Sequence, residues 1–304
     1  MISLKACGYT ALIDPMRGGN CLRLSRFASE ALRGPAAPED MDREPFFYGT
    51  PPLLYPNRIS GGRFTFEGRE YVLPIREKET GCFLHGDLDR TAFQVVRAEK
   101  DRAHLRRRFT SEDRYMTLPH AFTVDMGYHL TLEGLRQTVT VTNDSGLDMP
   151  FGLGFHTAFR LSFTPEGEAG KVTMRLDAAA EYPRDQKTHL PNGTVLTDYP
   201  DREALARGTF VPAARPVSRL FKMGDDKTMT LTDPGTGVRV TYTAERGYRY
   251  WMVFSPSPGF ICAEPQSWLT NCPNGPFPRE ETGFDFIVPG GSKVCETLMS
   301  IERI

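Results

Sequence analysis

A histidine in the middle of an apolar, glycine-containing run is the first candidate for acid–base chemistry. The run is Met149-Pro150-Phe151-Gly152-Leu153-Gly154-Phe155-His156-Thr157-Ala158-Phe159. Imidazole titrates near neutral pH, so an imidazole held among apolar side chains can exchange a proton with a bound molecule. A buried histidine that only bonds to a backbone carbonyl would give the same local pattern. Taken alone, the run favours that structural interpretation.

A glutamate at the end of a second apolar segment is the other candidate. Glu264 follows Phe260-Ile261-Cys262-Ala263, and burial at the end of such a strand would raise the pKa of its carboxyl group. The alternative is an edge glutamate that faces water or pairs with an arginine. Trp268 offers a flat apolar surface on which a sugar could stack, although tryptophan is more often a core residue.

Two polar segments in the first third of the chain add candidates for binding. Arg58 follows Asn57 and precedes a glycine-rich hairpin, where it is either a surface residue or a fork of donors for a ligand's hydroxyl groups. His85 lies beside a glycine in Leu84-His85-Gly86. No metal site is expected, because neither H-E-x-x-H nor H-x-H occurs.

Composition narrows the classes of protein to consider. The formal net charge is −1 over 304 residues, which argues against nucleic acid or an anionic membrane as the main partner. The N-terminus lacks the pattern of a signal peptide, and no apolar run has the length of a membrane span. The six cysteines are scattered without C-x-x-C spacing, so we expect reduced thiols and a cytoplasmic protein.

The elements that must position these residues are mostly strands. Alternating segments flank Glu67-Gly68 and Glu133-Gly134, which predicts two hairpins. Residues 34–56 hold six prolines, which predicts a long ordered loop, and such loops are often functional. The only helix candidates are short, Arg26 to Arg33 and Arg202 to Arg207. We therefore predict an all-β antiparallel sandwich with few short helices and a single domain over residues 1–304.

Four segments, in this order along the chain, resemble the aldose 1-epimerases (mutarotases) and their galactose mutarotase-like relatives. They are Asn57-Arg58-Ile59, Leu84-His85-Gly86, the run from Met149 to His156, and Glu264-Pro265. The resemblance implies an antiparallel β supersandwich, in agreement with the all-β prediction. It also implies a sugar as the substrate and an isomerase that needs no cofactor.

The resemblance also implies roles for individual residues. Glu264 would be the general base that takes the proton of the sugar's C1 hydroxyl, and His156 the general acid that protonates the ring oxygen. His85 would hydrogen-bond near the ring oxygen, and Arg58, with Asn57 beside it, would hold hydroxyl groups. If the acid and the base face one cleft from opposite sides of a sugar-sized gap, the enzyme functions are supported, and if they lie far apart, these functions are excluded.

Two positions depart from the family's pattern. Thr157-Ala158-Phe159 stands where relatives commonly carry an aromatic run after the histidine. Ser218 stands where an aspartate that binds sugar hydroxyls is expected, with Asp225-Asp226 nearby as a substitute.

Three functions therefore stay open: an epimerase acting on a free aldose, a hexose-phosphate mutarotase, and a non-catalytic carbohydrate-binding or regulatory protein on the same scaffold. A hexose-phosphate mutarotase needs cations at the rim of its pocket to bind the phosphate group, and the candidates are Arg63, Arg69 and Arg76. The protein is expected to be a monomer or a homodimer.

Overall fold

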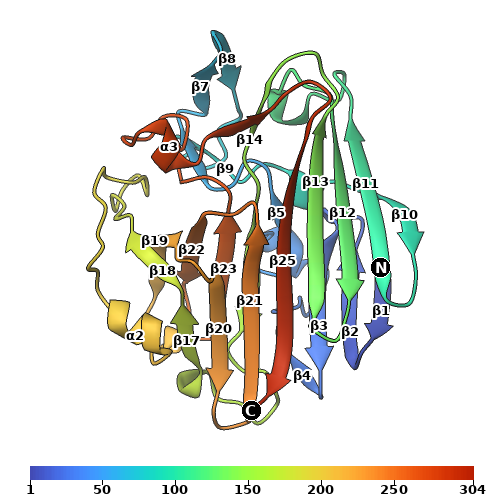
Figure 1. Ribbon diagram of the computed structural model, residues 1–304, viewed down its shortest axis with the longest axis vertical. Coiled ribbons are helices and arrows are strands. Elements are labelled where there is room, and N and C mark those ends of the chain that lie inside the picture. The colour runs from blue at the N-terminus through green and yellow to red at the C-terminus, as the bar shows by residue number, and fades with distance from the viewer.

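The computed structural model describes residues 1–304 as an all-β protein in which two large antiparallel sheets pack against each other (Figure 1). The larger sheet has the strand order β10-β11-β12-β13-β25-β21-β20-β17. Its strands are β10 (Gln94–Ala98), β11 (Arg102–Phe109), β12 (Phe122–Leu130), β13 (Leu135–Asn143), β17 (Thr173–Leu176), β20 (Thr228–Asp233), β21 (Val238–Arg246) and β25 (Ser292–Arg303).

The second large sheet carries the functional residues described below. Its order is β18-β19-β22-β23-β15-β5, and β16 pairs with β23 beyond this path. The strands are β5 (Pro52–Leu53), β15 (Gly154–Phe155), β16 (Thr157–Arg160), β18 (Ala178–Glu181), β19 (Val217–Met223), β22 (Tyr250–Ser255) and β23 (Phe260–Gln266).

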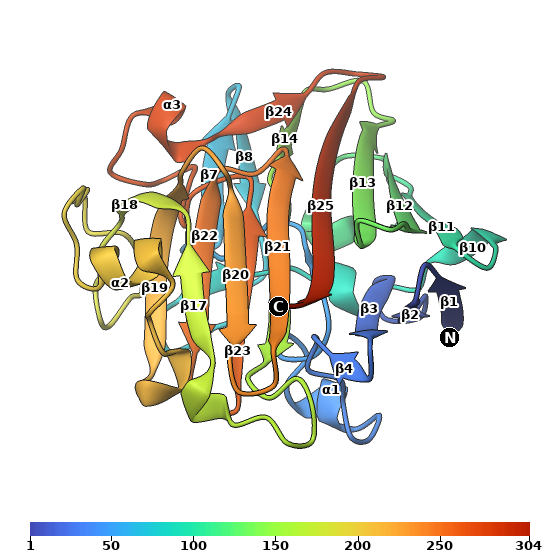
Figure 2. The same cartoon turned by 60° about the horizontal axis from the view of Figure 1, so that its bottom comes forward.

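Smaller elements close the ends of the sandwich. The first 30 residues form a four-stranded sheet that lies beside the β10–β13 part of the larger sheet (Figure 2). Its strands are β1 (Ile2–Ala6), β2 (Tyr9–Asp14), β3 (Asn20–Arg26) and β4 (Ser29–Glu30). Three two-stranded pairs are β6 (Arg58–Ser60) with β9 (Cys82–Leu84), β7 (Arg63–Phe66) with β8 (Arg69–Val72), and β14 (Met149–Phe151) with β24 (Asp285–Ile287).

Helices are few and short. The α-helices are α1 (Asp40–Arg43), α2 (Arg202–Arg207) and α3 (Arg279–Thr282), and the 3-10 turns are η1 (Leu88–Arg90), η2 (Tyr115–Thr117), η3 (Ala169–Lys171) and η4 (Pro212–Ala214). None of them has the length and apolar character that a membrane crossing requires.

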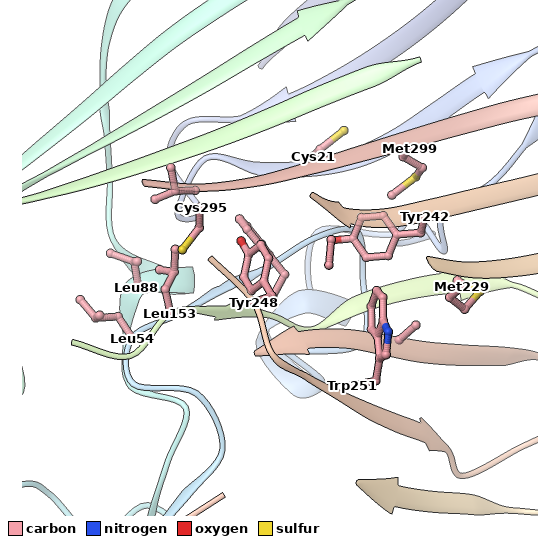
Figure 3. Packing of buried hydrophobic residues seen from close by; sticks show 14 of the residues in the cluster. Cys21, Leu54, Leu88, Leu153, Met229, Tyr242, Tyr248, Trp251, Cys295 and Met299 are labelled. Carbon is pink, nitrogen blue, oxygen red and sulfur yellow. The ribbon is translucent and has the colours of Figure 1, made fainter. Parts of the chain in front are cut away.

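One apolar core holds the sheets together. The strands of the larger sheet alternate buried and partly exposed residues, as in β12 and β13, which is the period of a sheet with one buried face. Their inward side chains join those of the second sheet in a single cluster of 65 buried residues (Figure 3). We infer from this continuous core that residues 1–304 form one domain.

The predicted fold class is confirmed, and the local expectations are confirmed in most places. Both hairpins form, and the helix expected at Arg202–Arg207 is α2. The helix expected over Arg26–Arg33 is wrong. Phe27 and Ala28 both have left-handed backbone angles (φ 54° and 62°), so the chain reverses there and β4 pairs back onto β3.

A buried aspartate outside the functional site gives a prediction on stability. Asp89, in η1, is 5% exposed, its Oδ1 atom has no hydrogen-bond partner, and burial raises its pKa to about 7. The folded state therefore holds this proton more tightly than the unfolded state, and stability falls as the pH rises from about 4 to about 7. We expect Asp89→Asn to raise the free energy of unfolding by on the order of 2 kcal/mol above about pH 7 and to have little effect near pH 4.

Thermal unfolding at both pH values checks this expectation, with the exposed Asp225→Asn as the control. An equal change in melting temperature at the two pH values, or a less stable Asp89→Asn protein near pH 7, would contradict it.

Candidate active site

The register of the second sheet places one candidate residue from each of several strands on a common face. Met252 on β22 lies opposite Glu264 on β23, and Phe254 lies opposite Ser218 on β19. Because side chains two residues apart share a face, Ser218, Met252, Phe254 and Glu264 all point the same way. All four line a single pocket, of which this face is the floor.

The strand register also places His156 next to Glu264. Thr157 pairs with Ala263, so the residue before it, His156, is aligned with Glu264, the residue after Ala263. The Nε2 atom of His156 lies 3.1 Å from Oε1 of Glu264, and both side chains are almost fully buried. The structure therefore places the two candidates for proton transfer in direct contact, His156 between β15 and β16 and Glu264 on the neighbouring β23.

The two side chains are not far apart, and they do not face each other across a gap either. The acid and the base are in direct contact at one side of the pocket and are not separated by a sugar-sized gap. A molecule on which both groups act must therefore dock over the pair. That geometry suits two oxygen atoms bonded to the same carbon.

Burial sets the protonation of the pair. It raises the pKa of Glu264 to about 8, although the nearby Arg184 guanidinium and a hydrogen bond from Gln266 act in the opposite direction. It lowers the pKa of His156 to about 3, because the imidazole is enclosed by Phe46, Phe47 and Phe254. Between these values the pair holds one proton, which lies on the carboxyl group when the pocket is empty.

The Asn57 and His85 side chains are held by a turn at the end of the β6–β9 pair. Both residues have left-handed backbone angles (φ 62° and 59°), and the His85 N–H donates to the Asn57 carbonyl. The N–H of Asn57 donates to Nδ1 of His85 over 3.1 Å. Because burial lowers the pKa of His85 well below its usual value, its ring is neutral and carries its hydrogen on Nε2. His85 is thus fixed as a hydrogen-bond donor beside His156.

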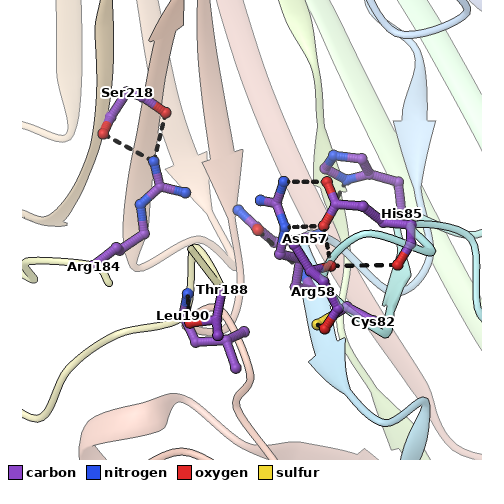
Figure 4. A network of polar contacts seen from close by, with 10 residues as sticks. Asn57, Arg58, Cys82, His85, Arg184, Thr188, Leu190 and Ser218 are labelled. Atoms are coloured by element: carbon purple, nitrogen blue, oxygen red, sulfur yellow. Dashed lines mark hydrogen bonds and ion pairs between the residues drawn. The ribbon is translucent and has the colours of Figure 1, made fainter. Parts of the chain in front are cut away.

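Arg58 lies on the same side of the pocket and is paired. Its Nε and Nη2 atoms each donate to a carboxylate oxygen of Glu77 over 2.6 Å. The bidentate contact holds the guanidinium in one orientation, and it also neutralises the charge of Arg58. Figure 4 shows this group, with Arg184 and Ser218 on the other side of the pocket.

The pocket measures about 270 Å³, close to the lower end of the ~300–1,000 Å³ range of ligand sites. Phe46 and Phe47 from the proline-rich loop form its apolar wall, next to the two histidines. The expectation that the loop over residues 34–56 serves the site therefore has a structural basis. Its size and its mix of aromatic and polar walls suit a small polar molecule.

Four residues that the sequence did not single out contribute to the site. Gln266 donates to Oε2 of Glu264 and contacts Asn57, which links the carboxyl group to the turn that carries His85. Arg184 and His189 enter from the loop between β18 and α2, and Glu77 orients Arg58. Of these residues, Gln266 could have been found from the sequence, because its i, i+2 spacing from Glu264 on one strand puts both side chains on one face. Arg184 and His189 could not, because they lie in a polar stretch without periodicity.

Trp268 is not part of the pocket, so the proposed stacking surface is corrected. Its indole is fully buried, it packs on Tyr55, and its Nε1–H donates to the carbonyl of Pro56. An added Cβ at Gly152 would lie 2.6 Å from the indole ring. Trp268 thus supports the chain just before Asn57, and Gly152 leaves room for it.

This packing predicts a large effect from one methyl group. Gly152→Ala would displace the indole and with it the Pro56 contact, at a cost of about 1–3 kcal/mol in the free energy of unfolding. Denaturant unfolding checks this, with Gly146→Ala as the control because open space surrounds that glycine. Unfolding midpoints that are equal for the two variants would contradict the packing argument.

His85, His156 and Glu264 also bring three potential metal-ligand atoms within 4.8 Å of one another. Its members come from three distant segments, so no metal-ligand spacing along the chain signals it. The fit to a metal ion is poor, because the N–H of Asn57 occupies Nδ1 of His85 and leaves the hydrogen on Nε2. A ligand through Nε2 would need that hydrogen removed.

The rim arginines expected from the sequence lie elsewhere. Arg63 pairs with Glu70 and Arg76 with Asp87, and neither these arginines nor Arg69 lines the pocket. The cations at the pocket are Arg58 and Arg184.

The fold is a β supersandwich, and its pocket holds a buried histidine–glutamate pair. Comparison with known proteins identifies the family to which the chain belongs. The sequence matches the aldose 1-epimerase family over residues 17–280, and the chain belongs to that family. A galactose mutarotase-like protein from Clostridium acetobutylicum has a similar crystal structure, with a TM-score of 0.93 and 28% identity over 99% of this chain and 95% of that one.

Two proteins of Escherichia coli strain K12 are similar in sequence. YphB is 35% identical over 112 residues, which is 37% of this chain and 37% of YphB. YihR is 25% identical over 247 residues, which is 81% of this chain and 76% of YihR. The match to YphB therefore spans little more than a third of either protein.

Proposed function

We propose that this protein is an aldose 1-epimerase that interconverts the α- and β-anomers of an aldose whose C1 hydroxyl is free. The observation that carries the proposal is the contact between His156 and Glu264 inside a pocket that also holds Arg58, Asn57 and His85. Such a reaction needs one group to accept a proton and one to donate it, both within hydrogen-bond reach of the sugar.

The reaction begins with the pair in its ionic form, with the proton on His156. Glu264 takes the proton of the C1 hydroxyl while His156 gives its proton to the ring oxygen. The C1–O5 bond breaks and the C1 oxygen becomes the carbonyl of the open-chain aldehyde. Rotation about C1–C2 exposes the other face of the carbonyl. Ring closure reverses both transfers: Glu264 gives its proton to the carbonyl oxygen at C1, and His156 takes back the proton of the hydroxyl group that forms the ring.

The number of protons is the same before and after each step. The empty pocket favours the neutral form, with the proton on Glu264, and the ionic form is reached by moving that proton across the 3.1 Å contact. Both forms carry one proton, so substrate binding need not be coupled to proton uptake from water. His85, as a fixed Nε2–H donor, would bind the ring oxygen or a neighbouring hydroxyl group.

Polarimetry of freshly dissolved α-anomers tests the proposal. Glucose, galactose, xylose, glucuronate and glucose 6-phosphate are followed with and without the protein, and buffer-catalysed mutarotation is subtracted. We expect faster equilibration for at least one of them. A rate equal to that of buffer for every sugar would contradict the proposal.

A carbohydrate-binding protein without catalysis is the alternative from another class. The aligned and desolvated acid–base pair supports the enzyme, because binding alone does not require two groups whose pKa values are moved apart. Sugar binding in calorimetry without any faster equilibration would favour the alternative.

A further inference from the structure

We propose that the substrate carries an anionic group, a carboxylate, phosphate or sulfonate, remote from the anomeric carbon, and that Arg184 binds it. The inference rests on the proposed function, because it names the class of sugar that the same pocket would take.

The first observation is that Arg184 is a cation without a counter-ion. Its Nη2 atom donates to the carbonyl oxygen and to Oγ of Ser218, over 2.8 and 2.6 Å. Its Nε atom is buried and has no partner. Both oxygen atoms of Ser218 are neutral acceptors, so they orient the guanidinium and leave its charge uncompensated. Arg184 is partly exposed, but its buried Nε atom is removed from water without a partner, and an accompanying anion would satisfy both this donor and the charge.

The carboxylates around Arg184 are already engaged. Glu77 binds Arg58 through both oxygen atoms, and Glu181 binds Arg219 in the same way. Asp185, the next residue, accepts the backbone N–H groups of Lys187 and Thr188 in its own turn. Among the acids near the pocket, none forms an ion pair with Arg184.

Glu264 does not fill this role either. Its carboxyl group contacts His156 and Gln266, and its pKa is raised to about 8 by burial, so it is mainly neutral in the empty pocket near pH 7. The pKa of Arg184 is lowered to about 10 by burial and by Arg58, which still leaves it charged. The pocket outside the catalytic pair thus holds two arginines and one carboxylate, Glu77.

The position of Arg184 fits the far end of a monosaccharide. Ser218, to which it is anchored, is on β19, and Glu264 is on β23, with β22 between them. Two strand spacings amount to about 10 Å between the backbones, and Arg184 and Glu264 line the same pocket. His189 of the same loop also lines the pocket, and burial together with the charges of both arginines lowers its pKa. An anion here would accept hydrogen bonds from Arg184 while C1 lies over the His156–Glu264 pair.

Ser218 explains why the charge is free. An aspartate at this position would pair with Arg184 and neutralise it, whereas the serine binds it and keeps it positive. Ser218→Asp therefore supplies an internal competitor for the proposed anion.

The first experiment measures binding separately from turnover. Calorimetry with Glu264→Gln protein compares glucose with glucuronate, glucose 6-phosphate and 6-deoxy-6-sulfoglucose. We expect at least one anionic sugar to bind roughly 10- to 100-fold more tightly than glucose, the value of a charge-assisted hydrogen bond. The ranking distinguishes carboxylate, phosphate and sulfonate.

Variants then assign the preference to Arg184. Arg184→Met and Ser218→Asp should each remove the preference for the anionic sugar, and Arg184→Lys should restore part of it, because it keeps the charge but not the fork of donors. Arg63→Met, which removes an exposed arginine outside the pocket, is the control for general charge effects and should keep the preference.

The outcomes separate this inference from the proposed function. Equal or weaker binding of every anionic sugar, or a preference that survives Arg184→Met, would overturn the inference. It would do so even if neutral aldoses were equilibrated rapidly and the proposed function stood. Tight, Arg184-dependent binding of an anionic sugar without any faster equilibration would support this anion site and overturn the epimerase.

Discussion

Glu264→Gln is expected to lower kcat/KM for anomeric interconversion by about 10²–10⁴-fold, the usual contribution of a positioned acid or base. Glutamine has nearly the same shape and can still hydrogen-bond to His156 and Gln266, but its amide cannot accept the proton of the C1 hydroxyl. The wild-type contacts that it would preserve are the 3.1 Å contact to His156 and the 3.1 Å bond from Gln266. The loss should therefore appear in the rate with little change in the fold.

Glu280→Gln is the matched control, because Glu280 is exposed on α3 and lies outside the pocket. Polarimetric rates and circular dichroism are measured on both variants and the wild type. Activity of Glu264→Gln within a factor of about three of the wild type would exclude Glu264 as an acid–base group.

The second large effect is a loss of activity at alkaline pH. The pair needs one proton, and above about pH 8 Glu264 loses it while His156 is already neutral, because burial raises the pKa of the first and lowers that of the second to about 3. No group can then protonate the ring oxygen, so kcat/KM should fall about tenfold per pH unit above this value. The rate should be level from about pH 4 to about pH 7, where the pair holds its single proton.

A substitution of Arg184 tests whether the alkaline limb of the pH profile reports the pKa of Glu264. Its positive charge lowers the pKa of Glu264, so Arg184→Met should move the alkaline limb to higher pH. The measurement is kcat/KM for a neutral aldose over the whole pH range, with the buffer rate subtracted at each point. A limb that moves to lower pH, or a wild-type rate that keeps rising above about pH 8, would contradict the assignment.

The fold was predictable because its signals are local. Strict alternation in segments such as β12 and the glycine turns between strands already define an antiparallel sandwich. The failed helix over Arg26–Arg33 shows the limit of such signals. Its composition suits a helix, but Phe27 and Ala28 adopt left-handed angles so that β4 pairs with β3, a tertiary choice that propensity does not reveal.

The site was predictable only in part. His156, Glu264, Asn57, Arg58 and His85 were singled out by the resemblance of their four segments to the aldose 1-epimerases, and the structure gathers them in one pocket. Arg184 had no such signal, since an arginine in a polar loop is usually solvated. Two bridges, Glu181 to Leu196 and Arg184 to Pro191, fold its loop back on itself, and Arg184 lines the pocket. The prediction that Trp268 forms a stacking surface was wrong because an aromatic residue in a core has the same sequence pattern as one in a binding site.

The most direct test of the account is a double-mutant cycle on the pair, measured as kcat/KM for anomeric interconversion with wild type, Glu264→Gln, His156→Gln and the double variant. If the two residues act as one acid–base unit through their 3.1 Å contact, each single change should cost about 10²–10⁴-fold, and the double variant should be within about threefold of the worse single variant. Losses that multiply in the double variant would mean that the two residues act independently, and a fully active His156→Gln protein would contradict the central role of the pair.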